Sequence, residues 1–227
     1  ESERDRLWAA LHRVASRSTA ECVVIEGPAG SGTSALTEWL SVRADETSGV
    51  SWRRITHGAA TGATDGLRSF LGWSLRVHHR SRADALDAVH AHLKAIGMPH
   101  RDDAIALLEV ARPTPLNQSG EGLSAHFESP EDRVALVGRY FAALAAERPM
   151  ILWLDDAHHD PESCGLVTRL LDHPPDVPIL VVMTTATEAV HDSTTITDHL
   201  SDLQQRPPAS QLVLQPLDAD GSIALIR

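Results

Sequence analysis

The chain has 227 residues, of which 42% are hydrophobic, so it is long and apolar enough to bury the core of one large domain. Its formal net charge of −11 at pH 7 disfavours direct contact of this segment with nucleic acid or with an anionic membrane. No apolar run approaches the roughly 20 residues of a membrane-spanning helix, and we expect no signal peptide. With Cys22 and Cys164 expected as reduced thiols, these features predict a cytoplasmic protein.

Strands and helices are predicted to alternate along the chain. In order, we expect helix 3–16, strand 22–25, helix 34–43, strand 50–55, helices 67–77, 83–96 and 104–110, a helix from 130 to about 147, strand 150–154, a helix from 160 to about 172, strand 178–184, helix 196–205 and strand 211–214. Most of the strands are unbroken apolar runs, which is typical of a parallel sheet buried on both faces. Trp39 and Trp52 are expected in the core.

This pattern predicts an α/β fold in three layers, with a parallel sheet covered by helices on both faces. The segment from about 65 to 128 is expected to be an all-helical insertion between the second strand and strand 150–154. A last apparent helix, 224–227, stops with the sequence. We therefore expect residues 1–227 to form a single domain from a longer regulator.

A glycine-rich loop joins the first predicted strand to the helix that follows it. Residues 27–34 read Gly-Pro-Ala-Gly-Ser-Gly-Thr-Ser and match the pattern G-x-x-x-x-G-K-[ST] except at the lysine, where Thr33 stands. Such a loop binds phosphate through backbone N–H groups, a helix N-terminus and the lysine ammonium. We therefore predict a P-loop NTPase that binds ATP or ADP with Mg²⁺. The predicted nucleotide-binding residues are Gly27, Pro28, Ala29, Gly30, Ser31, Gly32, Thr33, Ser34 and Ala35.

The predicted strand 150–154 ends in two aspartates. In P-loop NTPases the first carboxylate, here Asp155, holds Mg²⁺, usually through water, and the loop hydroxyl of Ser34 is its predicted companion ligand. The second, Asp156, would polarise the attacking water and is the predicted catalytic residue. We expect this acidic strand to lie beside the P-loop strand.

Residues 152–161, Leu-Trp-Leu-Asp-Asp-Ala-His-His-Asp-Pro, resemble the signature hhhDDxHWxDP of STAND-type ATPases in the AAA+ group. Segments 3–7, 148–149 and 214–217 are similar to the family's leading helix, strand lead-in and closing strand. Such domains belong to large bacterial regulators, for example the large ATP-binding LuxR-type transcriptional regulators and multidomain Ser/Thr kinases. The resemblance implies a signal-transduction domain whose partners are nucleotide, neighbouring domains of the same polypeptide and other copies of the chain.

The resemblance also exposes a second missing cation. The family's fourth strand ends in T-x-R, whose arginine senses the γ-phosphate, and the corresponding residue here is Ala186. With Thr33 at the lysine position, both cations that would face the terminal phosphates are absent. Losing two charged hydrogen bonds costs about 3–6 kcal/mol, roughly a hundred- to ten-thousand-fold in affinity. ATP hydrolysis is therefore expected to be impaired.

Two functions from different classes follow. In the first, nucleotide binding at residues 27–34, with Asp155 and Asp156, switches the packing of this domain on its neighbours. In the second, the fold is a nucleotide-independent scaffold for interaction or oligomerisation, and the glycines serve only the tight turn. The intact loop serine and both aspartates favour the switch, whereas the missing cations favour the scaffold. Arg53, Arg54 or an arginine from a neighbouring subunit are candidate replacement cations.

Overall fold

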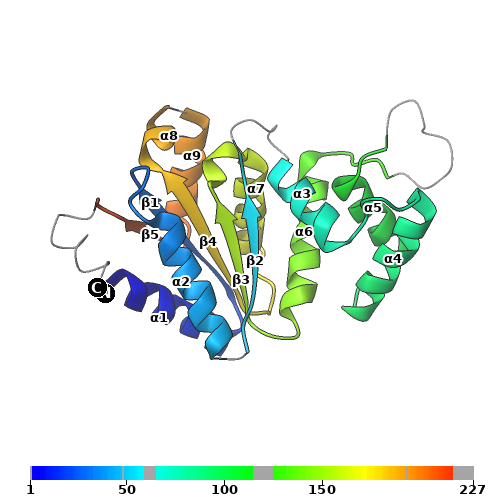
Figure 1. Ribbon diagram of the computed structural model, residues 1–227, viewed down its shortest axis with the longest axis horizontal. Coiled ribbons are helices and arrows are strands. Elements are labelled where there is room, and N and C mark those ends of the chain that lie inside the picture. Colours follow the sequence, from blue (N-terminus) through cyan, green and yellow to red (C-terminus); the bar gives the residue numbers. More distant parts are fainter. Residues whose placement is uncertain (1, 48, 59–64, 115–124, 193, 217–227) are drawn as a thin grey trace.

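The computed structural model describes residues 2–47, 49–58, 65–114, 125–192 and 194–216 (Figure 1). In chain order the elements are α1 (Ser2–Arg17), β1 (Ala20–Gly27), α2 (Thr33–Glu46), β2 (Ser51–Thr56), α3 (Asp65–Ser74), α4 (Arg82–Ala95), α5 (Arg101–Ala111), α6 (Pro130–Ala145), β3 (Met150–Asp155), η2 (Ala157–His159), α7 (Pro161–Asp172), β4 (Ile179–Ala186), α8 (Thr187–Asp192), α9 (Thr194–Gln204) and β5 (Ala209–Val213). Each expected element in this part of the chain is found, and α8 is an addition. The apparent helix 224–227, and residue 217 of the expected closing strand, lie outside the described residues.

The five strands form one parallel sheet in the order β2-β3-β4-β1-β5. This order corrects the expectation that the acidic strand lies beside the P-loop strand, because β4 stands between β3 and β1. In register, Gly27 of β1 lies opposite Ala186 of β4, and Leu154 of β3 lies opposite Met183 of β4. Since all strands run the same way, the glycine loop, the aspartate pair and the end of β4 meet at one edge of the sheet.

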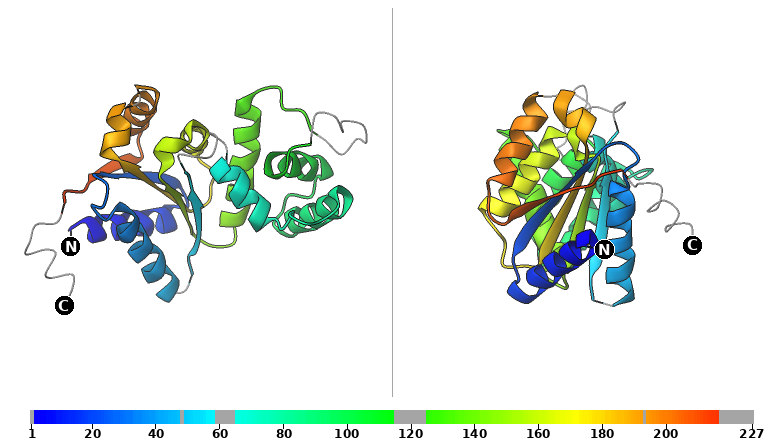
Figure 2. Two further views of the ribbon diagram at one scale, coloured as in Figure 1. Left: turned by 45° about the horizontal axis from the view of Figure 1, so that its top comes forward. Right: turned by 90° about the vertical axis from the view of Figure 1, so that its left-hand side faces the viewer.

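Helices cover both faces of the sheet, as predicted (Figure 2). Successive residues of β1 alternate between two apolar clusters: Val23 and Ile25 pack with α1 and α2, whereas Cys22 and Val24 pack with the helices of the other face. This alternation explains why the strand is apolar throughout rather than at every second residue. Cys22 and Cys164 are both buried and form no disulfide.

Between β2 and β3 the chain forms α3, α4, α5 and α6, which extend beyond the β2 edge of the sheet (Figure 1). The two outer strands of the sheet therefore differ in their surroundings: β2 is the edge strand on the side of these helices, and β5 is the edge strand on the other side. Trp52 on β2 is 41% exposed, contrary to the expected core position, because an edge strand has only one neighbouring strand. None of the described helices combines the length and apolarity needed to cross a bilayer.

Candidate functional site

The loop after β1 needs its glycines for reasons of backbone geometry. Gly30 and Gly32 have φ of +83° and +93°, in the left-handed region that L side chains rarely adopt. A Cβ at Gly27 would lie 2.3 Å from the Oγ of Ser31 and 3.2 Å from the carbonyl oxygen of Leu214, so a side chain there would require these neighbours to shift. The glycines are thus explained by the turn alone and do not by themselves show that phosphate binds.

The N-terminus of α2 differs from those of α6 and α7. Its N-cap, Gly32, makes no side-chain capping bond, and its first turn holds no acidic residue. By contrast, Ser129 caps α6 and Asp160 caps α7, each with acidic residues in the first turn. Backbone N–H groups and the positive end of the helix dipole at Thr33 are therefore not neutralised by an acidic side chain, which suits an anionic group.

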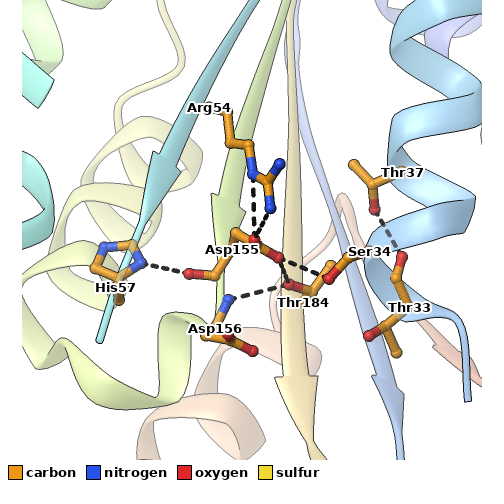
Figure 3. A network of polar contacts seen from close by, with 8 residues as sticks. All are labelled: Thr33, Ser34, Thr37, Arg54, His57, Asp155, Asp156 and Thr184. Atoms are coloured by element: carbon orange, nitrogen blue, oxygen red, sulfur yellow. Dashed lines mark hydrogen bonds and ion pairs between the residues drawn. The ribbon is translucent and has the colours of Figure 1, made fainter. Parts of the chain in front are cut away.

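Asp155, at the end of β3, is the centre of a polar network that spans three strands and α2 (Figure 3). Its Oδ1 accepts hydrogen bonds from Ser34 Oγ at 3.0 Å and Thr184 Oγ1 at 2.8 Å. Its Oδ2 accepts from Arg54 Nη2 at 2.5 Å and Nε at 3.2 Å, and the guanidinium lies 4.1 Å from the centre of the Trp153 ring. Asp155 is only 3% exposed, so these donors replace the water it has lost. We call Ser34, Arg54, Asp155 and Thr184 the metal side of the site.

A buried cluster behind the metal side holds the backbone of Asp155. The carbonyl of Asp155 accepts from the backbone N–H of His57 at 3.0 Å and from its Nδ1 at 2.8 Å. Because a carbonyl can only accept, Nδ1 carries the hydrogen. The other ring nitrogen, Nε2, lies 2.9 Å from Ser163 Oγ and 3.3 Å from Asp160 Oδ2. His57, Ser163 and Asp160 are all buried, so β2, β3 and α7 are linked directly beneath the site.

The opposite part of the site carries no cation at the two positions the family pattern would fill. Thr33 is the first residue of α2, and Ala186 ends β4 opposite Gly27. The His158 ring approaches Ala186, whose N–H donates to its Nδ1 at 3.4 Å. Burial, reinforced by His159, lowers the pKa of His158, so this imidazole is neutral at pH 7 and supplies no positive charge. We call Thr33, Ala186 and His158 the phosphate side.

Asp156 follows Asp155 of the metal side in the chain and precedes His158 of the phosphate side by two residues. It adopts the left-handed conformation with φ of 54°, and its N–H donates to Thr184 Oγ1 at 3.1 Å. This turn carries the chain from β3 into η2 and leaves the carboxylate half-buried. Its role as the group that polarises water remains a prediction.

The donor atoms of the metal side are of the kind that Mg²⁺ prefers. Ser34 Oγ and Asp155 Oδ1 are a hydroxyl and a carboxylate oxygen within 3.0 Å of each other, although 121 positions separate the residues. Among the described residues, no group of three or more His, Cys, Asp or Glu side chains could hold a metal ion alone. A magnesium ion here would therefore take most of its ligands from water and phosphate oxygens, which is usual for this ion.

The sequence did not identify two residues of the network, Thr184 and His57, and it left open which of two arginines on β2 reaches the site. Thr184 and His57 were not predicted as site residues, because placing them requires β4 beside β3 and β2 beside β3. The sequence signal for Thr184 is a hydroxyl residue at the end of the strand that neighbours β3. This signal was missed because we had placed β1, and not β4, beside β3. Of the two candidate cations on β2, Arg54 reaches the site, whereas Arg53 directs its Nη1 to the carbonyl of Trp52.

Residues 1–182 match the family model described as the AAA ATPase domain. No curated protein matches the chain.

Solved structures with similar folds include a chain of the Drosophila ORC bound to DNA, with a TM-score of 0.46 and 11% identity over 98% of this chain. VirB4 of Thermoanaerobacter pseudethanolicus aligns with a TM-score of 0.37 and 8% identity over 90% of this chain and 79% of its own. The Pif1 helicase from Candida albicans aligns with 0.32 and 14% over 96% of this chain and 40% of its own. The chain spans 45% of the Drosophila protein that it matches. Likenesses of this strength carry no argument about function.

Proposed function

The chain belongs to the AAA ATPase domain family, and on this basis we propose that it is a nucleotide-binding regulatory domain with impaired hydrolysis. Its ligands would be ATP or ADP with Mg²⁺, held at the sheet edge by the loop 27–34 and by Asp155. AAA ATPase domains generally bind ATP with Mg²⁺, and we further propose that this one has a regulatory role and hydrolyses ATP slowly.

The observation that carries the proposal is the contact between Ser34 and Asp155. The glycine turn explains itself through φ angles and close packing, but the turn does not require a hydroxyl aimed at a carboxylate on another strand. This pair is the minimum that a Mg²⁺-bound phosphate needs from the protein. The first turn of α2, free of acidic residues, supports a phosphate at the same place.

Impaired hydrolysis is supported by the phosphate side. Thr33 and Ala186 supply no charge there, and the lowered pKa of His158 keeps its ring neutral at pH 7. Phosphoryl transfer relies on positive charge around the γ-phosphate as its charge develops, so hydrolysis is expected to suffer more than binding. A domain that binds nucleotide and hydrolyses it slowly suits a switch between two packings on its neighbours.

The regulatory setting is proposed from the likeness of residues 152–161 to STAND-type ATPases. In this setting the chain is a cytoplasmic segment of a large bacterial regulator, with neighbouring domains and other copies of the chain as partners. No direct contact of this segment with nucleic acid or membrane is proposed, since its net charge is −11.

One observation favours the alternative, a nucleotide-independent scaffold. The positive charge of Arg54 already balances the negative charge of Asp155, so the polar network needs no metal ion for charge balance. A fold retained only for interactions would still need a cation beside this buried carboxylate, in place of a bound metal ion.

Isothermal titration of the purified chain with Mg·ATP and Mg·ADP separates these functions. A regulatory domain is expected to release heat with at least one nucleotide, and chelation of Mg²⁺ should weaken that binding. If neither nucleotide releases heat, the switch is excluded and the scaffold is favoured. A parallel assay of phosphate release tests the second half of the proposal, because turnover at ordinary ATPase rates would contradict impaired hydrolysis.

A further inference from the structure

We infer that Arg54 is the movable cation of this site: it holds Asp155 when the site is empty of nucleotide and turns to the γ-phosphate when Mg·ATP binds. The inference rests on the proposed nucleotide binding. It assigns to a residue of β2 the charge that the loop lysine and the fourth-strand arginine would otherwise supply.

Arg54 and the phosphate-binding loop contact the same carboxylate. Arg54 binds Oδ2 of Asp155, while Ser34 of the loop binds Oδ1 of the same carboxylate (Figure 3). A single carboxylate group therefore separates the guanidinium from the hydroxyl of the phosphate-binding loop. An arginine side chain is long enough to change partners across that span by rotation about its own bonds, with no movement of β2.

A magnesium ion would compete with Arg54 for one buried carboxylate. Asp155 carries one negative charge and now has one cation. A divalent ion at Oδ1 and Ser34 would place two further positive charges beside the guanidinium, and like charges this close repel strongly in a buried site. The phosphate oxygens that arrive with that ion are bidentate acceptors of the kind that arginine prefers.

The surroundings of Arg54 leave its side chain room to move. The Arg54 side chain is 40% exposed, although its partner Asp155 is almost fully buried. It also lines an open groove of about 500 Å³ between β2 and α3, together with Thr56 and Ser69. Among the described residues, the ion pair with Asp155 and the face of Trp153 hold it in place, so loss of the ion pair leaves the ring contact.

Arg53 supplies the matched control within the same strand. Successive residues of a strand point to opposite faces. Arg53 lies on the face of His92 and Tyr140: burial and then the charge of Arg53 lower the pKa of His92, whereas burial raises the pKa of Tyr140 against the opposing effect of Arg53. Removing either arginine deletes the same charge, but only Arg54 contacts Asp155 among the interactions described for the two residues.

The test compares the wild type, Arg54→Met and Arg53→Met by calorimetry with Mg·ADP and with Mg·AMP-PNP, a non-hydrolysable triphosphate. We expect Arg54→Met to weaken AMP-PNP binding by about tenfold to a hundredfold, the range of one charged hydrogen bond, and to change ADP binding by less than about threefold. Arg53→Met should change neither. Arg54→Lys, which retains the charge, should recover part of the loss, and circular dichroism checks that each variant is folded.

Tryptophan fluorescence gives a second readout that does not depend on affinity. Turning of Arg54 away from Trp153 should alter the emission on saturation with Mg·AMP-PNP more than with Mg·ADP. This difference should vanish in Arg54→Met and in Trp153→Phe. An emission change that is the same in Arg54→Met as in the wild type would contradict movement of the arginine.

The outcomes separate this inference from the proposed function. If the wild type binds neither nucleotide, both fail. If the wild type binds but Arg54→Met affects ADP and AMP-PNP equally, in either direction, nucleotide binding stands and the phosphate role of Arg54 is overturned.

Discussion

The metal side and the phosphate side share one sheet edge but differ in how fully they are built. On the metal side, Asp155 accepts from Ser34, Thr184 and Arg54, and a buried cluster fixes its backbone from below. On the phosphate side, residue 33 is a threonine, residue 186 is an alanine, and the nearby histidine is neutral. Residues 33 and 186 therefore supply no positive charge to the phosphate side, whereas Arg54 places a cation beside the carboxylate.

The difference between the two sides can be related to what each contributes to the stability of the folded chain. A buried carboxylate destabilises the folded chain if it has no hydrogen-bond partners. The bonds to Asp155 are therefore needed for folding, whether or not nucleotide binds. A cation facing solvent at the phosphate side stabilises the folded chain little and is kept only if nucleotide chemistry needs it. The contrast is the one expected of the domain that we propose, which would bind nucleotide and hydrolyse it slowly.

The largest effect is expected from disturbing the buried cluster that supports the metal side. Asp160→Ala removes the cap of α7, worth about 1 kcal/mol, and also removes the buried carboxylate that accepts from Ser163 Oγ and lies 3.3 Å from His57 Nε2, which costs about 1–3 kcal/mol more. We expect urea denaturation to show a loss of about 3 kcal/mol in the free energy of unfolding. Ser129→Ala, which removes the exposed cap of α6, should cost about 1 kcal/mol. Equal losses in the two variants would show that the cluster contributes nothing beyond capping.

Adding a cation to the phosphate side should reduce the contrast between the two sides. Thr33→Lys is expected to raise the affinity for Mg·ATP at least about tenfold, because an ammonium at the start of α2 would face the terminal phosphates. Calorimetry measures the gain. Val42→Lys, at an exposed position further along α2, adds the same charge away from the loop and should leave the affinity unchanged. If Thr33→Lys brings no gain, the loop is not a usable phosphate site.

Removing one donor from the metal side should weaken it without abolishing it. Ser34→Ala deletes the hydroxyl that donates to Asp155 and is the predicted magnesium ligand. We expect the Mg²⁺-dependent part of nucleotide affinity to fall by about five- to tenfold, and the free energy of unfolding to fall by about 1 kcal/mol. The control is Ser31→Ala in the same loop, whose buried Oγ has no hydrogen-bond partner among the described residues. A stability loss in this control as large as in Ser34→Ala would contradict the assignment.

The smallest effect is expected from pH and concerns His158. Its pKa in the folded chain is lowered below the ordinary value of 6.5, chiefly by burial. As pH falls through 6.5 the unfolded chain takes up a proton before the folded chain does, so stability present at neutral pH is lost on the acid side. His158→Gln should therefore lose less stability than the wild type between pH 7.5 and pH 5.5, measured by urea denaturation at both values. The same substitution at the exposed His199 should follow the wild type, and identical behaviour of both variants would count against the burial effect.

The fold could be predicted from the sequence because its signals are local. The glycines of the loop, the Ser-Pro and Asp-Pro starts of α6 and α7, and the apolar runs of β1, β3 and β4 each act over a few residues. The same is true of the loop serine and of the aspartate pair, whose spacing along the chain was sufficient to propose a magnesium site.

The strand order could not be predicted in this way, since it depends on packing between residues far apart in the chain. We expected β3 beside β1, and β4 lies between them and contributes Thr184 to the site. The role of His57 was hidden for the same reason, because it appears only when β2 and α7 meet behind Asp155.

Arg53 and Arg54 show most clearly where the sequence reaches its limit. The sequence by itself determined that β2 carries two adjacent arginines and that positions 33 and 186 carry none. Only the tertiary structure decided which arginine serves the site: the pleat sends neighbouring side chains to opposite faces, and the pairing of β2 with β3 brings Arg54 over Trp153 and onto Asp155. Charge is a property of the residue, but its partner is set by the strands that pack beside it.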